Sequence, residues 1–404
     1  MSGPGRESRT TLYANFGAEE KRDAKRAGRE LLRLASLWQG LFPQDPDVLL
    51  PPQAFPPGTR WERATALGRS EATAISKHPD SSALVAGRLA SARGFVPWLP
   101  DDSSADESMR LEVENWGPEP RTVAKVHDKA FAVRSAAGIA DTTWSSLPVI
   151  LAPQDLRSPQ TIEDRVAEWP AGWRRRFTLK PRIGTSGRGR VSGRDGRLDD
   201  AGRRSLAGLA SKGGAILEPW FDRVDDLSAQ YWIEPGRQPE LLGTTRQLLA
   251  GSGIYLGNEG VFEVNASGRI RVRSGHEADP PLIDDSTRLV ELAAGEGFYG
   301  PCGVDAFTYR NRIGEEASES LRSIVELNAR FTTGTIALGW LEKACREATS
   351  PGKPMSGRWR FLFAPEMARK YLGDHVMPQR SEGWLTFAIG PRSDPSLLAL
   401  TVTG

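Results

Sequence analysis

Hydrophobic and polar positions change their period along the first 100 residues, and this change predicts alternating strands and helices. Apolar runs that are typical of short strands occur at residues 11–17 and 48–50. Helical spacing of apolar side chains occurs at residues 19–38, 65–75 and 82–92. Strands and helices in this rhythm predict a small open α/β domain at the start of the chain.

A second unit is predicted after an acidic, proline-rich connection at residues 100–120. Its helices are expected at residues 127–138 and 287–295. Its strands are expected at residues 177–180, 215–218, 303–309 and 323–330, with antiparallel strands through 228–273. Two further short strands are expected near the end of the chain, at residues 359–363 and 383–388.

The composition is that of a globular chain with more than one domain. Its 404 residues favour two or three domains, and 39% of them are hydrophobic. A formal charge of +2 without a basic stripe argues against a nucleic-acid partner. Residues 1–10 are unlike a secretory signal and no apolar run has membrane length, so we expect a cytoplasmic protein without a membrane partner. The spacing of Cys302 and Cys345 argues against a disulfide framework and a zinc site.

A glycine-rich loop follows the predicted strand that ends at Lys180. It contains Thr185, Ser186 and Gly187, whose hydroxyls and backbone N–H groups can surround phosphate oxygens beside the lysine ammonium. Only ten of the 53 basic residues are lysines, so a lysine at this place is informative. The loop is not a P-loop, in which the lysine follows the glycines. A surface hairpin rich in glycine and arginine is the alternative.

Oxygen-bearing side chains are predicted to gather on a pair of strands. Alternation places Glu326, Asn328 and Arg330 on one face of their strand. Asp305 offers a second carboxylate on the preceding predicted strand. Carboxylate and amide oxygens suit Mg²⁺, and an arginine on the same face can hold a phosphate or an anionic intermediate. A solvent-facing sheet of mixed charge is the alternative.

The predicted strand at residues 215–218 runs into a polar break. Such a strand can form a hinge against an adenine ring, with Glu218 and the backbone around Trp220 beside the base. Asp225 and Asp226 follow at a distance at which a carboxylate can meet ribose hydroxyls. Each acid taken singly has a plainer explanation as a loop residue.

The order of these elements resembles the ATP-grasp superfamily of carboxylate–amine ligases. The resemblance covers roughly residues 123–342 and is most specific at Gly303–Asp305 and Val325–Gly334. It implies an α/β (α+β) fold class, in which a pre-ATP-grasp α/β domain precedes a two-lobed ATP-grasp fold. The implied boundaries are 1–122 for the first domain, 123–217 for the glycine-loop lobe, 218–342 for the metal-binding lobe and 343–404 for a C-terminal extension.

The resemblance also implies a role for each matching residue. Lys129 and Lys180 would bind the α- and β-phosphates of ATP, and Thr185, Ser186 and Gly187 would close over the triphosphate. Glu218 and Trp220 would hold adenine, and Asp226, or less well Asp225, the ribose. Asp305, Glu326 and Asn328 would hold two Mg²⁺ ions, with Arg330 and, more loosely, Arg246 near the reacting groups. The chain departs from the common pattern in having fewer consecutive loop glycines and Pro219 where many members have lysine.

The implied activity is formation of an amide or peptide bond through an acyl phosphate, with release of ADP and phosphate. The implied substrates are a small carboxylate and an amine, such as amino acids or a short peptide, and a homodimer is common in this fold. Two alternatives stay open, an ATP-binding regulatory module without turnover and a small-molecule kinase. A dehydrogenase is excluded because no Gly-x-Gly-x-x-Gly follows the first predicted strand.

Overall fold

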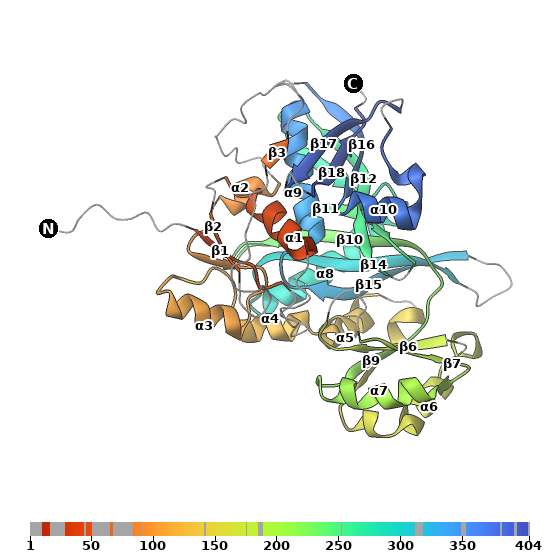
Figure 1. Cartoon of the computed structure of the whole chain (residues 1–404). Helices are drawn as coiled ribbons and strands as arrows, with labels where there is room; N and C mark the ends of the chain where they lie inside the picture. Colours follow the sequence, from red (N-terminus) through yellow and green to blue (C-terminus); the bar gives the residue numbers. More distant parts are fainter. Residues whose placement is uncertain are drawn as a thin grey trace.

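The computed structural model describes residues 10–16, 29–43, 46–50, 65–67, 84–90, 92–140, 143–174, 176–184, 189–251, 253–311, 318–348, 353–379, 382–391 and 394–402 (Figure 1). The predicted loop residues Thr185, Ser186 and Gly187 lie outside these ranges, as does the first part of the helix predicted at 19–38. None of the helices within these ranges has the length and apolar character needed to cross a membrane.

A three-stranded parallel sheet with the order β2-β1-β4 begins the chain. Its strands are β1 (Thr11–Tyr13), β2 (Asp47–Leu49) and β4 (Phe95–Pro97). Helix α1 (Arg29–Gln39) connects β1 to β2 and buries Leu34 and Trp38. The predicted α/β start is confirmed for these elements.

Other predictions in this region are wrong in part. Of the helix predicted at 65–75, residues 68–75 lie outside the described ranges, and residues 65–67 form strand β3 (Thr65–Leu67) instead, because they pair with strand β17 more than 300 residues later. The helix predicted at 82–92 shrinks to α2 (Ala86–Leu89). The connection at 100–120 contains helix α3 (Asp102–Arg110), whose first turn is stabilised by a reciprocal capping box between Asp101 and Ser104.

The second sheet has five antiparallel strands in the order β5-β9-β6-β7-β8. They are β5 (Val149–Leu151), β6 (Arg176–Pro181), β7 (Val191–Arg194), β8 (Arg197–Leu198) and β9 (Ala215–Pro219). Helices α6 (Pro159–Ala167) and α7 (Asp200–Ala210) lie below this sheet in Figure 1. The strands predicted at 177–180 and 215–218 are confirmed.

The third and largest sheet has ten strands. Nine of them follow the order β15-β14-β10-β11-β12-β16-β18-β17-β3, and the tenth, β13, pairs with β12 outside this order. They are β3, β10 (Arg223–Ile233), β11 (Glu240–Leu249), β12 (Tyr255–Val264), β13 (Ile270–Arg273), β14 (Gly300–Asn311), β15 (Ser318–Asn328), β16 (Met355–Leu362), β17 (Leu385–Gly390) and β18 (Ser396–Leu400). All strands predicted from residue 228 onward are found, but β15 ends at Asn328, so the prediction that Arg330 shares a strand face with Glu326 and Asn328 by alternation is wrong. The sheet also joins the predicted first domain, through β3, to the predicted C-terminal extension, through β16 to β18.

The remaining helices are α4 (Pro120–His127), α5 (Lys129–Ile139), α8 (Asp279–Gly295), α9 (Thr333–Ala348) and α10 (Pro365–Leu372). Single-turn 3-10 helices occur at Thr143–Ser146, Asp155–Arg157, Ala171–Trp173 and Asp374–Val376. The helix predicted at 287–295 is confirmed, although it begins already at Asp279. The helix predicted at 127–138 is confirmed as α5, which follows α4 directly.

An aromatic cluster fastens the first sheet to the end of β15. The ring of Trp38 lies 5.4 Å from Trp98 and 5.1 Å from Phe331, and Trp98 lies 5.9 Å from Phe331. All three side chains are buried. Because Phe331 follows Arg330 directly, this packing also fixes the chain that leaves the predicted metal-binding strand.

Candidate functional site

The antiparallel pair β14–β15 brings the predicted oxygen ligands together. Asp305 stands opposite Glu326, and Gly303 stands opposite Asn328, so all three polar side chains share one face. A side chain at position 303 would displace the buried Gln230 carboxamide, because an added Cβ would lie 2.9 Å from it. The prediction that these two strands are neighbours is confirmed by their register.

Asp305 is the most strongly hydrogen-bonded acid of this group. Its Oδ1 accepts from Gln247 Nε2 at 2.8 Å and from Ser228 Oγ at 3.1 Å, and its Oδ2 accepts from Asn328 Nδ2 at 3.0 Å. Burial and the neighbouring Glu326 carboxylate nevertheless raise the pKa of Asp305 to about 7. Two carboxylates are thus held side by side in a buried place where their negative charge is incompletely offset, which is the environment that a cation relieves.

Glu326 and Lys129 link the two lobes. Lys129 Nζ lies 2.9 Å from Glu326 Oε2 and donates to the carbonyl of Gly184 at 2.7 Å. Burial alone would raise the pKa of Glu326, but Lys129, Lys180 and the nearby His127 lower it below its ordinary value. Lys129 therefore stands between the carboxylate strand and the loop that follows β6.

The position of Lys129 is set by the start of α5. Asp128 caps this helix by accepting from the Ala130 N–H at 2.8 Å, and it also receives the guanidinium of Arg182, whose Nε lies 3.1 Å away. The Lys129 N–H donates to the Arg182 carbonyl at 3.0 Å. The helix start and the end of β6 are thus tied together on both sides of the lysine.

Lys180 belongs to a buried network of three charges. Its ammonium contacts one carboxylate oxygen of Glu218, and Arg322 Nη2 lies 2.7 Å from the other. Burial would raise the pKa of Glu218, but Arg322 and Lys180 together lower it to about 2. Burial lowers the pKa of Lys180 to about 8 despite the opposing effect of Glu218, so the ammonium is still mostly charged at neutral pH.

A cavity of about 420 Å³ lies between these elements, within the range of roughly 300–1,000 Å³ that is usual for ligand pockets. Among the residues predicted for the site, those that line it are Lys129, Lys180, Asp226, Asp305, Glu326, Asn328 and Arg330. Its walls come from α5 and β6, which lie below β14 and β15 in Figure 1, and from α1, β12 and α10, which lie above them. Residues about 200 positions apart in sequence therefore face the same space.

Two predicted residues, Glu218 and Trp220, do not line the cavity. The carboxylate of Glu218 is occupied by Lys180 and Arg322 as described above. The ring of Trp220 is covered by the guanidinium groups of Arg176 and Arg190, at 4.8 and 4.7 Å from its centroid. Neither Glu218 nor Trp220 is among the described residues that line the cavity, so their predicted contact with adenine is untested.

Arg246 lies on the face of the sheet opposite the cavity. Its guanidinium pairs with Asp225 at 2.6 Å and with Glu259 at 3.5 Å, whereas the next residue, Gln247, lines the cavity. Successive strand residues point to opposite faces, so Asp225 lies on the face of Arg246 and Asp226 on the face of the cavity. Asp226 lines the cavity and pairs with Arg223 at 2.5 Å, which favours it over Asp225 as the ribose residue.

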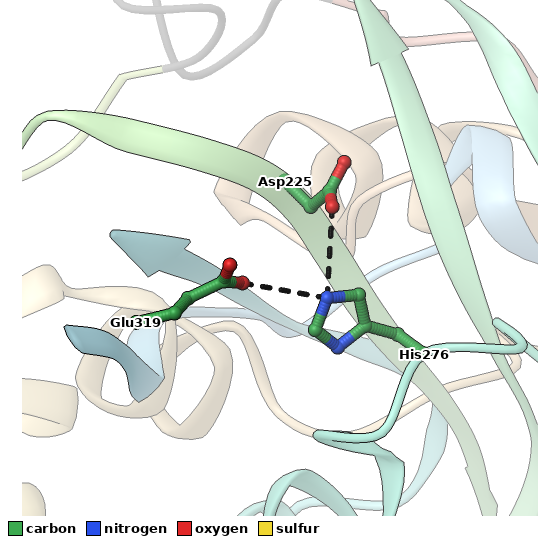
Figure 2. Close-up of side chains that lie close together, drawn as sticks. All are labelled: Asp225, His276 and Glu319. Atoms are coloured by element: carbon green, nitrogen blue, oxygen red, sulfur yellow. Dashed lines mark ion pairs between the residues drawn. The ribbon is translucent and has the colours of Figure 1, made fainter. Parts of the chain in front are cut away.

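Figure 2 shows the cluster that Asp225 forms on the far face, with His276 and Glu319. The His276 Nε2 atom lies 3.6 Å from Asp225 Oδ2 and 3.5 Å from Glu319 Oε1. His276 Nδ1 accepts the Ala278 N–H at 3.0 Å, so the proton of the neutral ring is on Nε2. A ring in this form presents a hydrogen to the two carboxylates and has no lone pair there for a metal. We interpret the cluster as a structural contact that holds β10, β15 and the start of α8 together.

Sequence reasoning missed Ser228, Gln247 and Arg322. Ser228 has the same parity along β10 as Asp226, and this period-two pattern could have been used to find it. Gln247 could be found only from the register of β11, because the sequence alone does not show whether Arg246 or Gln247 faces the cavity. Arg322 carried no signal, since nothing local distinguishes a buried arginine from the many exposed ones.

For the ligase activity that the ATP-grasp resemblance implies, replacing Gln247 by leucine is expected to lower turnover roughly 10- to 100-fold, because Asp305 Oδ1 loses its shortest hydrogen bond at a buried acid. Replacing the neighbouring Arg246 by leucine is the matched control and is expected to change turnover by less than about threefold, because its pairs lie on the other face. Steady-state ADP release measures both. An Arg246 variant more impaired than the Gln247 variant would reverse the assignment of faces.

Comparison with known proteins locates this architecture among solved structures. No protein-family model matches the sequence, and no curated protein matches it. The N5-carboxyaminoimidazole synthetase from Staphylococcus aureus, complexed with ADP, aligns over 98% of this chain and 93% of its own, with 10% identity and a TM-score of 0.50. The biotin carboxylase domain of the Hydrogenobacter thermophilus 2-oxoglutarate carboxylase aligns over 99% of this chain and 87% of its own, with 12% identity and a TM-score of 0.49.

The chain therefore has the ATP-grasp fold. The sequence-based prediction of this fold is confirmed, whereas the boundaries of its domains and lobes stay a prediction. At 10% identity the likeness shows the fold alone, so the activity has to be argued from the residues of this site.

Proposed function

We propose that this protein is an ATP- and Mg²⁺-dependent ligase that joins a carboxylate to an amine. The observation that carries the proposal is the convergence of Lys129, Lys180, the Asp305–Glu326–Asn328 group and Arg330 on one cavity between two lobes. Two lysines beside paired carboxylates suit a polyphosphate with its metal, because the lysines meet phosphate oxygens and the carboxylates meet the cation.

The residues present fit the cofactors that such a reaction needs. Asp305 and Glu326 place carboxylate oxygens opposite each other, and the raised pKa of Asp305 shows that their negative charge is incompletely offset. These two side chains and the Asn328 amide would hold magnesium, which would supply positive charge to the phosphoryl oxygens during transfer. The number of ions is left to measurement.

For the nucleotide, we assign the α- and β-phosphates to Lys129 and Lys180, and the triphosphate cover to Thr185, Ser186 and Gly187. Asp226 is our choice for the ribose, because it faces the cavity. We assign the adenine ring to the strand end at Glu218 and the backbone around Trp220. Since Lys180 and Arg322 occupy the Glu218 carboxylate, that residue would act there through its backbone.

The reaction we propose begins with attack of the substrate carboxylate on the γ-phosphorus, which yields an acyl phosphate and ADP. The amine then attacks the acyl carbon and phosphate leaves. Lys129 and Lys180 would offset the charge that collects on the phosphoryl oxygens, and Arg330 would hold the acyl phosphate or the adduct that follows. Closure over the cavity would keep water from the acyl phosphate.

The test is a screen for ADP release with amino-acid pairs and magnesium, read by product mass. A ligase gives a condensed product, and hydroxylamine traps its intermediate as a hydroxamate. A stable phosphorylated product would instead identify a small-molecule kinase. ATP binding without ADP release from any pair would favour the regulatory module and overturn the ligase assignment.

A further inference from the structure

One end of the cavity is apolar, and the site described so far does not use it. Its walls are Leu31 and Leu34 from α1, Tyr255 and Leu256 from β12, Phe363 from the segment after β16, and Met367 from α10. In Figure 1, α1 and α10 lie on the side of β14 and β15 opposite to α5 and β6, which carry the two lysines. The apolar walls and the lysines therefore belong to different ends of the space.

The walls at this end are held in place by polar contacts behind them. Arg33, which is buried, donates from Nη1 to the Phe363 carbonyl at 3.1 Å and from Nε to the Asp394 carbonyl at 3.1 Å. Its guanidinium also lies 5.4 Å from the centroid of the Phe363 ring. Helix α1 and the C-terminal segment are thus joined independently of any ligand, so the apolar surface between them is preformed.

Polar atoms on these walls have partners within the protein. The Tyr255 hydroxyl donates to the Asn258 side chain, which in turn donates to Thr245 Oγ1 at 2.9 Å. The Tyr255 ring packs against Phe363 with its centroid 6.1 Å away. Among the described residues that line this end, the side chain charged at neutral pH is Glu30, which is exposed. A charged group that enters beyond Glu30 would find no counterion on Leu34, Leu256 or Met367.

The apolar end adjoins the groups that would handle a carboxylate. Arg330 and the first residues of α9, Thr333 and Gly334, line the same cavity. An amino acid whose carboxylate lies near Arg330 would project its side chain away from the lysines and towards α1 and α10. Because an apolar surface rewards burial of apolar groups and penalises charged ones, the walls select among side chains.

We propose that this end is the side-chain pocket of the substrate, and that the substrate is an amino acid with an apolar side chain of the size of leucine, methionine or phenylalanine. The proposal rests on the proposed ligase function and adds the substrate class to it. It also gives the C-terminal extension a role, since Phe363 and Met367 complete a pocket that residues 123–342 leave open on this side.

The first experiment measures ADP release by the full chain with ATP and magnesium across single amino acids, each paired with an equimolar mixture of amine acceptors. Alanine, valine, leucine, methionine and phenylalanine form the apolar series, and serine, aspartate and lysine form the polar one. We expect kcat/KM to rise about fourfold for each added methylene until the pocket is filled. The polar series is expected to fall at least about tenfold below leucine.

The second experiment reverses the preference. Met367→Lys places a cation in the wall of the pocket, and Glu366→Lys is the matched control because Glu366 is the neighbouring, exposed residue of the same helix. We expect Met367→Lys to lower kcat/KM for leucine by roughly 10- to 200-fold and to raise the relative rate with aspartate. The control is expected to keep the wild-type order, and calorimetric binding of ATP should be equal in all three proteins.

The outcomes separate the two proposals. ADP release with aspartate, lysine or serine as fast as with leucine overturns the apolar pocket and leaves the ligase standing. The apolar pocket is likewise overturned if Met367→Lys folds and keeps the wild-type preference, and the wild-type series decides alone if that variant does not fold. ATP binding without release from any amino acid overturns the ligase function itself.

Discussion

Glutamine in place of Glu326 is expected to abolish measurable ADP release, a loss of more than about 100-fold, while ATP binding changes by less than about tenfold. The amide keeps the shape of the side chain and can still accept from Lys129, which lies 2.9 Å from Oε2. It lacks the negative charge that stands opposite Asp305 on β14 and that we assign to magnesium. Binding relies on many contacts along the nucleotide, whereas transfer relies on charge at this one place.

Two measurements check this expectation. Calorimetry gives the affinity for ATP with magnesium, and a coupled assay gives the rate of ADP release. Glu319→Gln is the control, because Glu319 lies on the same strand but at its other end, beside His276 on the far face. Full turnover by Glu326→Gln would overturn the metal assignment, and an equal loss in Glu319→Gln would show that the effect is structural.

Much of this site could be predicted because side chains on a strand alternate between its two faces, and the polar residues of the site occupy alternate positions. Glu326 and Asn328 are two residues apart, so their shared face follows from the period of a strand alone. The order of the lysine, the glycine loop and the two acidic strands then supplied the ATP-grasp resemblance, which the fold confirms. Local periodicity and the order of motifs were sufficient to find these residues, because each lies in a helix or strand or directly beside one.

The rest depended on contacts between distant parts of the chain. Thr65–Leu67 begins a stretch of sequence with helical spacing of apolar residues but forms a strand, because β17 offers backbone partners that local spacing cannot reveal. Arg246 and Gln247 could not be ranked before the register of β10 and β11 was known. The two C-terminal strands were predicted as elements, whereas their place in the large sheet follows only from long-range pairing, of β16 with β12 and of β17 with β18 and β3.

Glutamine in place of Glu218 is expected to destabilise the protein by about 3–5 kcal/mol, because it removes the carboxylate that lies against two buried cations, Lys180 and Arg322. Arg322 is 1% exposed and lies between Trp144, Phe221 and Phe307, with centroid distances of 5.1 to 5.6 Å. It cannot reach water without opening this aromatic packing. A double variant that also replaces Arg322 by methionine is expected to recover part of the loss, since the uncompensated charge is then gone.

Urea unfolding at several pH values tests the same network through its protonation. The pKa of Glu218 is about 2 in the folded chain and about 4.3 when unfolded, so its contribution is fully present well above the unfolded value and is lost as the pH falls towards 2. The wild type should therefore lose stability relative to Glu218→Gln over this interval, and the difference between them should shrink. Glu107→Gln, which removes the exposed pair with Arg110, serves as the control and should change stability far less at neutral pH. A neutral-pH loss no larger than that of the control would mean that the buried charges of Glu218, Lys180 and Arg322 do not contribute to stability as expected.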